Sequence, residues 1–274
     1  MSASAQVALA PVASWASASS AWARRLSWLA LPWLAPLLLL ALWELVTRAQ
    51  LVSAQVLVAP AQVVAAFVEL ARTGELAGHL RDSLMRLGIG LAAGASSGLL
   101  FGILMGVSKR VEDYSAPIFQ AVRQVPSIAL IPAFILIFGV EETFKILLVS
   151  KACFFPVALA AFNGVKTISR QYLEVAAVYQ LPRLSLLRLL VLPATVPPIV
   201  AGVRISLGRA WIVLVAAELM AADHGIGQMM EMGRQMFRID VVMVGVFVTG
   251  IIGLGLDGGV RLIERSLGKW RVNR

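Results

Sequence analysis

The chain has very few of the residues that build disulfides, metal clusters or a charged surface. Its 274 residues include a single cysteine, Cys153, so no intrachain disulfide can form. The two histidines, His79 and His224, lie far apart in the sequence, which disfavours a metal cluster. Only 14% of the residues are charged, 59% are hydrophobic, and the mean hydropathy is +0.84. Because a water-soluble domain cannot bury that much apolar surface, lipid must be the solvent for much of the chain.

The sequence also lacks the phosphate-binding loop G-x-x-x-x-G-K-[ST], so the chain cannot itself hold ATP in that way. Its apolar runs are continuous and do not alternate, which excludes membrane-spanning β-strands. The net charge of +9 is therefore interpreted as basic loops that face an anionic membrane surface, and not as a nucleic-acid site.

Six apolar segments can cross a hydrocarbon core about 30 Å thick as helices, which predicts an all-α, polytopic membrane protein. Prolines interrupt the third segment, and broken backbone is tolerated only inside a bundle or beside a cavity. The predicted organisation is a disordered cytoplasmic leader over 1–26, a transmembrane domain over 27–266 and a cytoplasmic tail over 267–274. The six segments are Leu29–Val46, Leu87–Val107, Ile118–Val140, Ile146–Phe162, Val196–Ala222 and Val241–Leu262.

The loop between the first two spans is amphipathic and is predicted to lie outside the membrane, with a short helix from Ala61 to Ala71. Lysine and arginine are more frequent in the loops on the side of the N-terminus. Since basic loops stay in the cytoplasm, both termini are predicted to be cytoplasmic.

Glycine recurs at every fourth position of the second span, which places all of these glycines on one helical face. Another helix can approach closely there, so the stripe is interpreted as a packing face, with a direct role in a transport pathway as the alternative. The glycines are Gly90, Gly94, Gly98, Gly102 and Gly106.

A charged segment with internal prolines, EVAAVYQLPRLSLLRLLVLPATVPP (174–198), separates two very apolar spans. Its pattern predicts a helix over Tyr172–Gln180, a corner at Leu181-Pro182-Arg183, and a second helix over Leu184–Leu192. The second helix is expected to stop at Pro193, because the residue before a proline is pushed out of the α region. Two short helices joined by a corner form a protrusion that suits docking to a soluble partner.

This segment resembles the cytoplasmic loop of ABC-importer membrane subunits. The family pattern is Glu-Ala-Ala, three residues, Gly, about nine residues, then an apolar residue, any residue and Leu-Pro; here it reads Glu174-Val175-Ala176, Gln180 and Val191-Leu192-Pro193. Gln180 replaces the family's glycine, and Pro182 could supply the turn instead. The blocks 108–146, 202–220 and 224–230 resemble the branch that imports nitrate, sulfonates, taurine and similar small anions.

The resemblance implies a type I ABC-importer permease fold in a bacterial inner membrane, and a transport subunit that is not itself an enzyme. It implies a second permease copy, two cytoplasmic ATPase subunits that bind ATP and Mg, and an external solute-binding protein. No cofactor or metal is expected on this chain. The implied substrate is an aliphatic sulfonate or taurine, with nitrate or an aromatic carboxylate as alternatives. The implied ATPase-coupling residues are Glu174, Ala176, Ala177, Gln180, Leu192 and Pro193.

Charged residues inside the predicted spans are further candidates, because a charge near the bilayer centre costs about 2.5–3.5 kcal/mol on insertion scales. Such residues face the bundle interior or water. Arg209 and Glu218 are nine residues apart on one helix, so they face roughly opposite ways and are not expected to pair. The alternative for these residues is ion pairing or packing within the bundle. The pathway candidates are Lys151, Arg209, Trp211 and Glu218.

The last outer loop contains His224-Gly225-Ile226-Gly227, which predicts a turn and, by the resemblance, a candidate outer gate or binding-protein contact. The sequence disfavours two other classes of membrane protein. An ion-coupled secondary carrier predicts an inverted repeat, which the sequence does not show. An intramembrane enzyme needs a reactive constellation within the spans, and the spans offer none.

Overall fold

The computed structural model describes residues 34–53 and 56–268. The chain divides into two units, residues 1–62 and residues 63–274. In the first unit a helix covers residues 34–48, and the Trp43 indole nitrogen donates a hydrogen bond to the Val58 carbonyl oxygen at 2.9 Å. The predicted span Leu29–Val46 therefore begins outside the described residues. The predicted leader over 1–26 lies outside them, and so do residues 269–274 of the tail predicted over 267–274.

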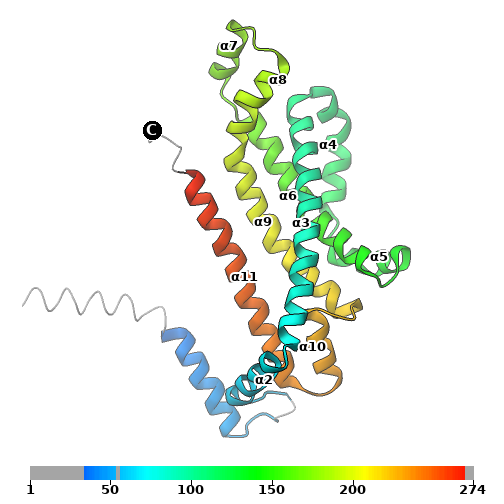
Figure 1. The fold of residues 1–274 in the computed structure, drawn as a ribbon, viewed down its shortest axis with the longest axis vertical. Helices are drawn as coiled ribbons and strands as arrows, with labels where there is room; N and C mark the ends of the chain where they lie inside the picture. The colour runs from blue at the N-terminus through cyan, green and yellow to red at the C-terminus, as the bar shows by residue number, and fades with distance from the viewer. Residues whose placement is uncertain (1–33, 54–55, 269–274) are drawn as a thin grey trace, which may run out of the picture. The chain divides into compact units, whose positions relative to one another are not determined.

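Four long helices run alongside one another in the second unit (Figure 1). They are α3 (Glu75–Val107), α6 (Glu142–Lys166), α9 (Leu192–Ala221) and α11 (Ile239–Gly268), and each is long and apolar enough to cross a membrane. This arrangement confirms the predicted all-α, polytopic fold. The predicted number of six spans stays a prediction, because the described residues contain four such helices, or five if one bent pair of helices is counted as a span.

The bent pair covers the predicted third span, Ile118–Val140, and confirms that its backbone is interrupted, although its first arm begins earlier, at Lys109. It consists of α4 (Lys109–Gln124), the short 3₁₀ helix η1 (Ile128–Leu130) and α5 (Ile131–Phe138), with a bend of 83° between its two arms. Val125 lies before Pro126 and takes an extended conformation, as expected of a residue that precedes proline, and this ends α4. Pro126 thus marks the break, whereas Pro117 lies inside α4 and Pro132 lies in the first turn of α5.

The second span begins earlier than predicted. The helix α2 (Pro60–Thr73) confirms the helix predicted over Ala61–Ala71, but α3 starts at Glu75 and not near Leu87. Gly74 separates the two helices in a left-handed conformation, with φ of 79°. The charged residues at the start of α3 had been assigned to a loop. They remain helical, and Arg86 among them is buried with carboxylate partners.

The glycine stripe of α3 packs against α6, as the packing interpretation expected. Backbone atoms of α6 lie where a side chain would be: an added Cβ would collide with the Ser150 carbonyl oxygen at Gly94 and with the Ala158 carbonyl oxygen at Gly102. The small residues therefore permit a close approach of α3 and α6.

Valine at Gly94 or Gly102 is expected to lower the stability of the bundle by about 1–3 kcal/mol, because the added atoms overpack the α3–α6 contact. Gly88→Val is a matched control in the same helix, since an added Cβ at Gly88 meets no atom within 4 Å. The measurement is the temperature at which half of the detergent-solubilised protein loses its monodisperse elution peak. Equal losses for Gly94→Val and Gly88→Val would contradict the packing role.

Candidate coupling and translocation sites

Residues 170–191 form a protrusion at one end of the second unit, which we call the coupling knob (Figure 1). It contains α7 (Arg170–Val178), α8 (Arg183–Leu186) and the π-helical segment η2 (Leu187–Val191). Ala176 is buried within the knob, whereas Glu174 and Ala177 are exposed. The surface of the knob is unusually apolar for an exposed element: the side chains more than half exposed include Tyr172, Val175, Val178, Tyr179, Leu184 and Leu189.

The corner of the knob is built at Gln180. Gln180 adopts a left-handed conformation, with φ of 49°, which is the conformation that glycine adopts without strain. The Leu181 N–H donates to the Ala176 carbonyl oxygen at 3.1 Å, and the Gln180 N–H donates to the Ala177 carbonyl oxygen at 3.0 Å. This pair of bonds is a Schellman C-cap. The backbone thus turns at the position of the family's glycine, and the first helix ends at Val178 rather than at the predicted Gln180.

Gln180→Gly is expected to stabilise the corner by about 0.5–1 kcal/mol, because relief of left-handed strain outweighs the greater freedom of unfolded glycine. Hydrogen exchange of the amides over 176–184 should slow by about two- to fivefold, the factor that corresponds to this free energy. Gln171→Gly, in the first turn of α7, should instead speed exchange, since glycine has a low helix propensity. Faster exchange in Gln180→Gly would show that the corner is not strained.

Pro193 does not end the second helix, so the predicted stop there is wrong. The helical path continues from α8 through η2 into α9, and Pro193 lies in the first turn of α9. A π-helical turn is wider than an α-helical turn, and η2 gives the proline ring room immediately before it. Leu192 and Pro193 therefore belong to the base of a span, where the knob joins the membrane helices.

Two adjoining cavities between α4, α6 and α9 bring Lys151 and Arg209 together. The first has a volume of about 280 Å³, and both residues line it with Arg123. The second, of about 570 Å³, shares Arg123 and Arg209 with the first. The Lys151 ammonium donates to the Val125 carbonyl oxygen at 2.9 Å and lies 5.5 Å from the centroid of the Phe155 ring. We call Arg123, Lys151 and Arg209 the cation cluster.

The sequence indicated two members of the cation cluster and missed the third. Arg123 is the penultimate residue of α4, and the break after this helix makes Arg123 part of a cavity wall. The sequence signal that could have identified Arg123 is its position just before Pro126, where the helix breaks. Trp211 is 3% exposed, and its indole nitrogen donates to the Thr249 carbonyl oxygen at 3.0 Å, so it packs α9 against α11. Neither Trp211 nor Glu218 lines the two cavities.

Glu218 instead lies in a buried ionic network at the other end of the bundle. It is 1% exposed, and its carboxylate accepts hydrogen bonds from Arg86 at 2.8 Å, from Ser83 at 2.8 Å and from the Gly227 N–H at 3.1 Å. Arg86 also forms a two-point ion pair with Glu142. Glu218 thus pairs with Arg86 and not with Arg209, in agreement with the helical spacing.

The same network fixes the loop that follows α9. Arg86 donates to the His224 carbonyl oxygen at 2.6 Å, and the Gly225 N–H donates to His79 Nδ1 at 3.0 Å. Gly225 has a φ of 126°, which is open to glycine alone, and α10 (Ile226–Gln235) begins directly after it. The predicted turn at His224-Gly225 is present, whereas the helix that follows it was not predicted.

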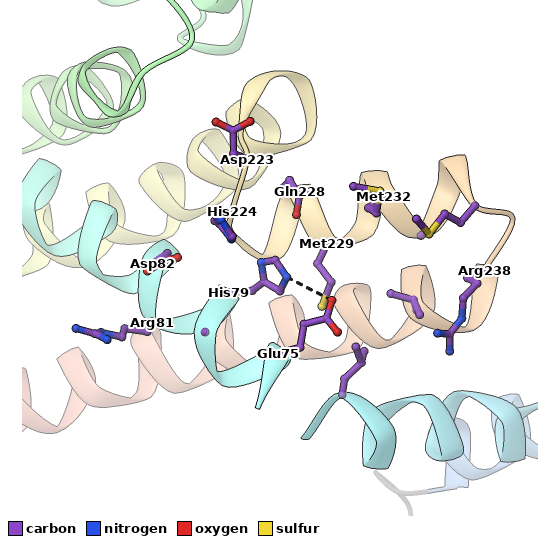
Figure 2. A pocket seen from close by; sticks show the side chains of 15 residues that line it. Glu75, His79, Arg81, Asp82, Asp223, His224, Gln228, Met229, Met232 and Arg238 are labelled. Atoms are coloured by element: carbon purple, nitrogen blue, oxygen red, sulfur yellow. Dashed lines mark ion pairs between the residues drawn. The ribbon is translucent and has the colours of Figure 1, made fainter. Parts of the chain in front are cut away.

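A pocket of about 680 Å³ opens beside this loop, lined by residues of α3 and α10 (Figure 2). His79 and His224 face it, with their ring centroids 5.9 Å apart, and Glu75 pairs with His79 at 3.7 Å. Within the described part of the chain, no group of three or more His, Cys, Asp or Glu residues could hold a metal ion. The lining of the pocket combines polar side chains, such as His79 and Asp82, with methionine side chains, such as Met229.

Comparison with known proteins identifies related sequences and folds. The model of the family described as "Binding-protein-dependent transport system inner membrane component" matches residues 98–269. A Bacillus subtilis protein named as an aliphatic sulfonates transport permease, SsuC, is 42% identical over 87% of this chain and 86% of its own length. The Escherichia coli taurine transport system permease protein TauC is 37% identical over 85% of this chain and 86% of its own length.

A solved structure of the inward-facing MetNI methionine ABC transporter shares the fold, with a TM-score of 0.62. The match covers 73% of this chain and 98% of the matched chain at 18% sequence identity, so it bears on the fold alone.

Proposed function

Because this chain belongs to the binding-protein-dependent transport system inner membrane components, a family of ABC-importer permeases, we propose that it forms the translocation pathway for a small anion, an aliphatic sulfonate or taurine. The relatives named for sulfonates and for taurine support this substrate class. The observation that carries the proposal is the joint presence of an exposed apolar knob and an intramembrane cation cluster. The knob suits an external ATPase, and the cluster suits an anion.

In this proposal the coupling knob docks to an ATPase that binds ATP and Mg, and this chain holds no cofactor or metal itself. Glu174 and Ala177 lie on the exposed surface of α7. Ala176 is buried and packs α7 within the knob, and Gln180 forms the corner of the knob. Leu192 and Pro193 begin α9, so movement of the knob would pass directly into a span. Two permease copies, two ATPase subunits and an external binding protein would complete the importer. The knob and both termini would lie in the cytoplasm of a bacterial cell.

The runner-up substrates are nitrate and an aromatic carboxylate in the same importer class. Nitrate is supported by the Synechococcus elongatus nitrate import permease protein NrtB, which is 32% identical over 67% of each chain. An ion-coupled secondary carrier is the alternative of a different class.

Reconstitution into liposomes tests the proposed function. With partner ATPases, the binding protein and internal ATP, the chain should accumulate labelled ethanesulfonate, and it should accumulate none when ATP or the ATPases are omitted. Accumulation by this chain alone, driven by an ion gradient, would instead support the carrier. Accumulation of nitrate but not ethanesulfonate would support the runner-up substrate.

A further inference from the structure

Three cations from three different helices converge at one depth in the bundle. Arg123 lies at the end of α4, Lys151 lies within α6, and Arg209 lies within α9. Each is about four to five helical turns from the end of its helix that lies nearer the coupling knob. The two cavities share Arg123, Arg209 and Phe155, and Lys151 lines the smaller one, so the cations lie around two adjoining hollows.

The members of the cation cluster lack the partners that neighbouring cations have. Arg86, Lys145 and Arg204, in the same bundle, each pair with a carboxylate. Among the described residues, none of the three cluster members forms an ion pair, and no aspartate or glutamate lines either cavity. Unpaired charges within a membrane-spanning helix bundle are unfavourable, and they mark water-filled pathways or substrate sites.

The walls beside the cation cluster are mostly apolar. The smaller cavity is lined by Phe155, Ile128, Ile212 and Val213 next to the three cations. An anionic headgroup could lie against the cations while a short hydrocarbon tail contacts these side chains. An ammonium group on the same ligand would meet three positive charges and no carboxylate.

We propose that Arg123, Lys151 and Arg209 form a seat for the headgroup of a monoanion with an apolar tail, such as a simple alkanesulfonate, and that this seat disfavours zwitterions. The inference rests on the proposed import of a small anion, and it narrows the substrate within that class. Arg123 thereby gains a role as a specificity-determining residue. The seat discriminates by charge, and this discrimination adds to any selection by a binding protein.

Charged thiol reagents test this seat on the purified full-length permease, without ATPases or transport. In a Cys153→Ala background, Ala201→Cys places a thiol in the larger cavity, and Val178→Cys places one on the coupling knob. The probes are the 2-sulfonatoethyl and the 2-(trimethylammonium)ethyl methanethiosulfonates, which carry opposite charges. The labelling rate of the anionic reagent divided by that of the cationic reagent, each normalised to its rate with a free thiol, reports the electrostatic potential at the cysteine.

The ratio at Ala201→Cys is expected to favour the anionic reagent. It should fall by about tenfold when Arg123, Lys151 or Arg209 is replaced by glutamine, whereas the ratio at Val178→Cys should not change. In the chain that retains all three cations, ethanesulfonate should slow labelling of Ala201→Cys, and taurine at the same concentration should slow it much less. This protection measurement needs no substitution of a charged residue, so it tests the seat even if a glutamine variant misfolds.

An unchanged ratio in folded glutamine variants would overturn the seat, and so would equal protection by taurine and ethanesulfonate. These results come from the isolated permease. The labelling results can therefore contradict the seat while ATP-driven uptake is observed, or support the seat while no uptake is observed. The seat and the proposed import function are thus tested separately.

Discussion

Arg86→Met is expected to destabilise the protein by about 3–5 kcal/mol, the typical cost of leaving a buried charge without its partner. Glu218 is 1% exposed, and without Arg86 its carboxylate would keep only the Ser83 hydroxyl and the Gly227 N–H as partners. The loop after α9 would also lose the bond from Arg86 to the His224 carbonyl oxygen. The measurement is thermal unfolding of the detergent-solubilised protein, followed by loss of the monodisperse peak.

Two variants isolate the cause of this loss. Arg81→Met removes an exposed arginine that lies less than two turns away in the same helix, and it should change the stability little. Glu218→Gln combined with Arg86→Met removes the unpaired charge, so the double variant should recover much of the stability lost by Arg86→Met alone. If the double variant were no more stable than Arg86→Met, the electrostatic explanation would be wrong.

Tyr179→Ala is expected to weaken binding of the partner ATPase by about thirtyfold, which corresponds to about 2 kcal/mol for a typical hot-spot aromatic. Tyr179 is 75% exposed on the coupling knob, so its truncation removes few contacts within the chain and should leave the fold intact. Glu174→Ala on the same helix should reduce both ATPase co-purification and ATP-driven uptake. Binding of the ATPase to the permease in nanodiscs measures the effect directly.

Met236→Ala is the matched control, because Met236 is 63% exposed and follows α10 at the opposite end of the bundle. It should leave ATPase binding unchanged. Normal ATPase co-purification and uptake in both Tyr179→Ala and Glu174→Ala would remove the coupling knob from the mechanism.

The sequence was sufficient to predict the features that are determined by residues close together in the chain. The glycine spacing in α3 predicted a packing face, and the Leu181-Pro182 corner predicted a turn between two short helices. The family's glycine position also marked the residue that turns, since Gln180 takes the left-handed conformation that glycine favours. Hydropathy predicted the long helices, because satisfying the backbone in lipid leaves few alternatives to a helix.

Features that depend on distant residues could not be predicted in the same way. Arg86 meets Glu218 across 132 positions of sequence, and no local pattern indicates that pairing. The stop predicted at Pro193 failed because the rule assumes an ordinary α-helix, whereas the preceding turn is π-helical. Arg123 was missed because its role depends on where α4 breaks and on which helices lie beside the break.

The account as a whole requires that the coupling knob face the cytoplasm. A single cysteine at Val178, in a Cys153→Ala background, can be exposed to a membrane-impermeant maleimide in right-side-out and in inverted membrane vesicles. The account predicts rapid labelling in inverted vesicles and none in intact right-side-out vesicles. Labelling from the outside would place the knob beyond the reach of any cytoplasmic ATPase and would contradict the proposed coupling.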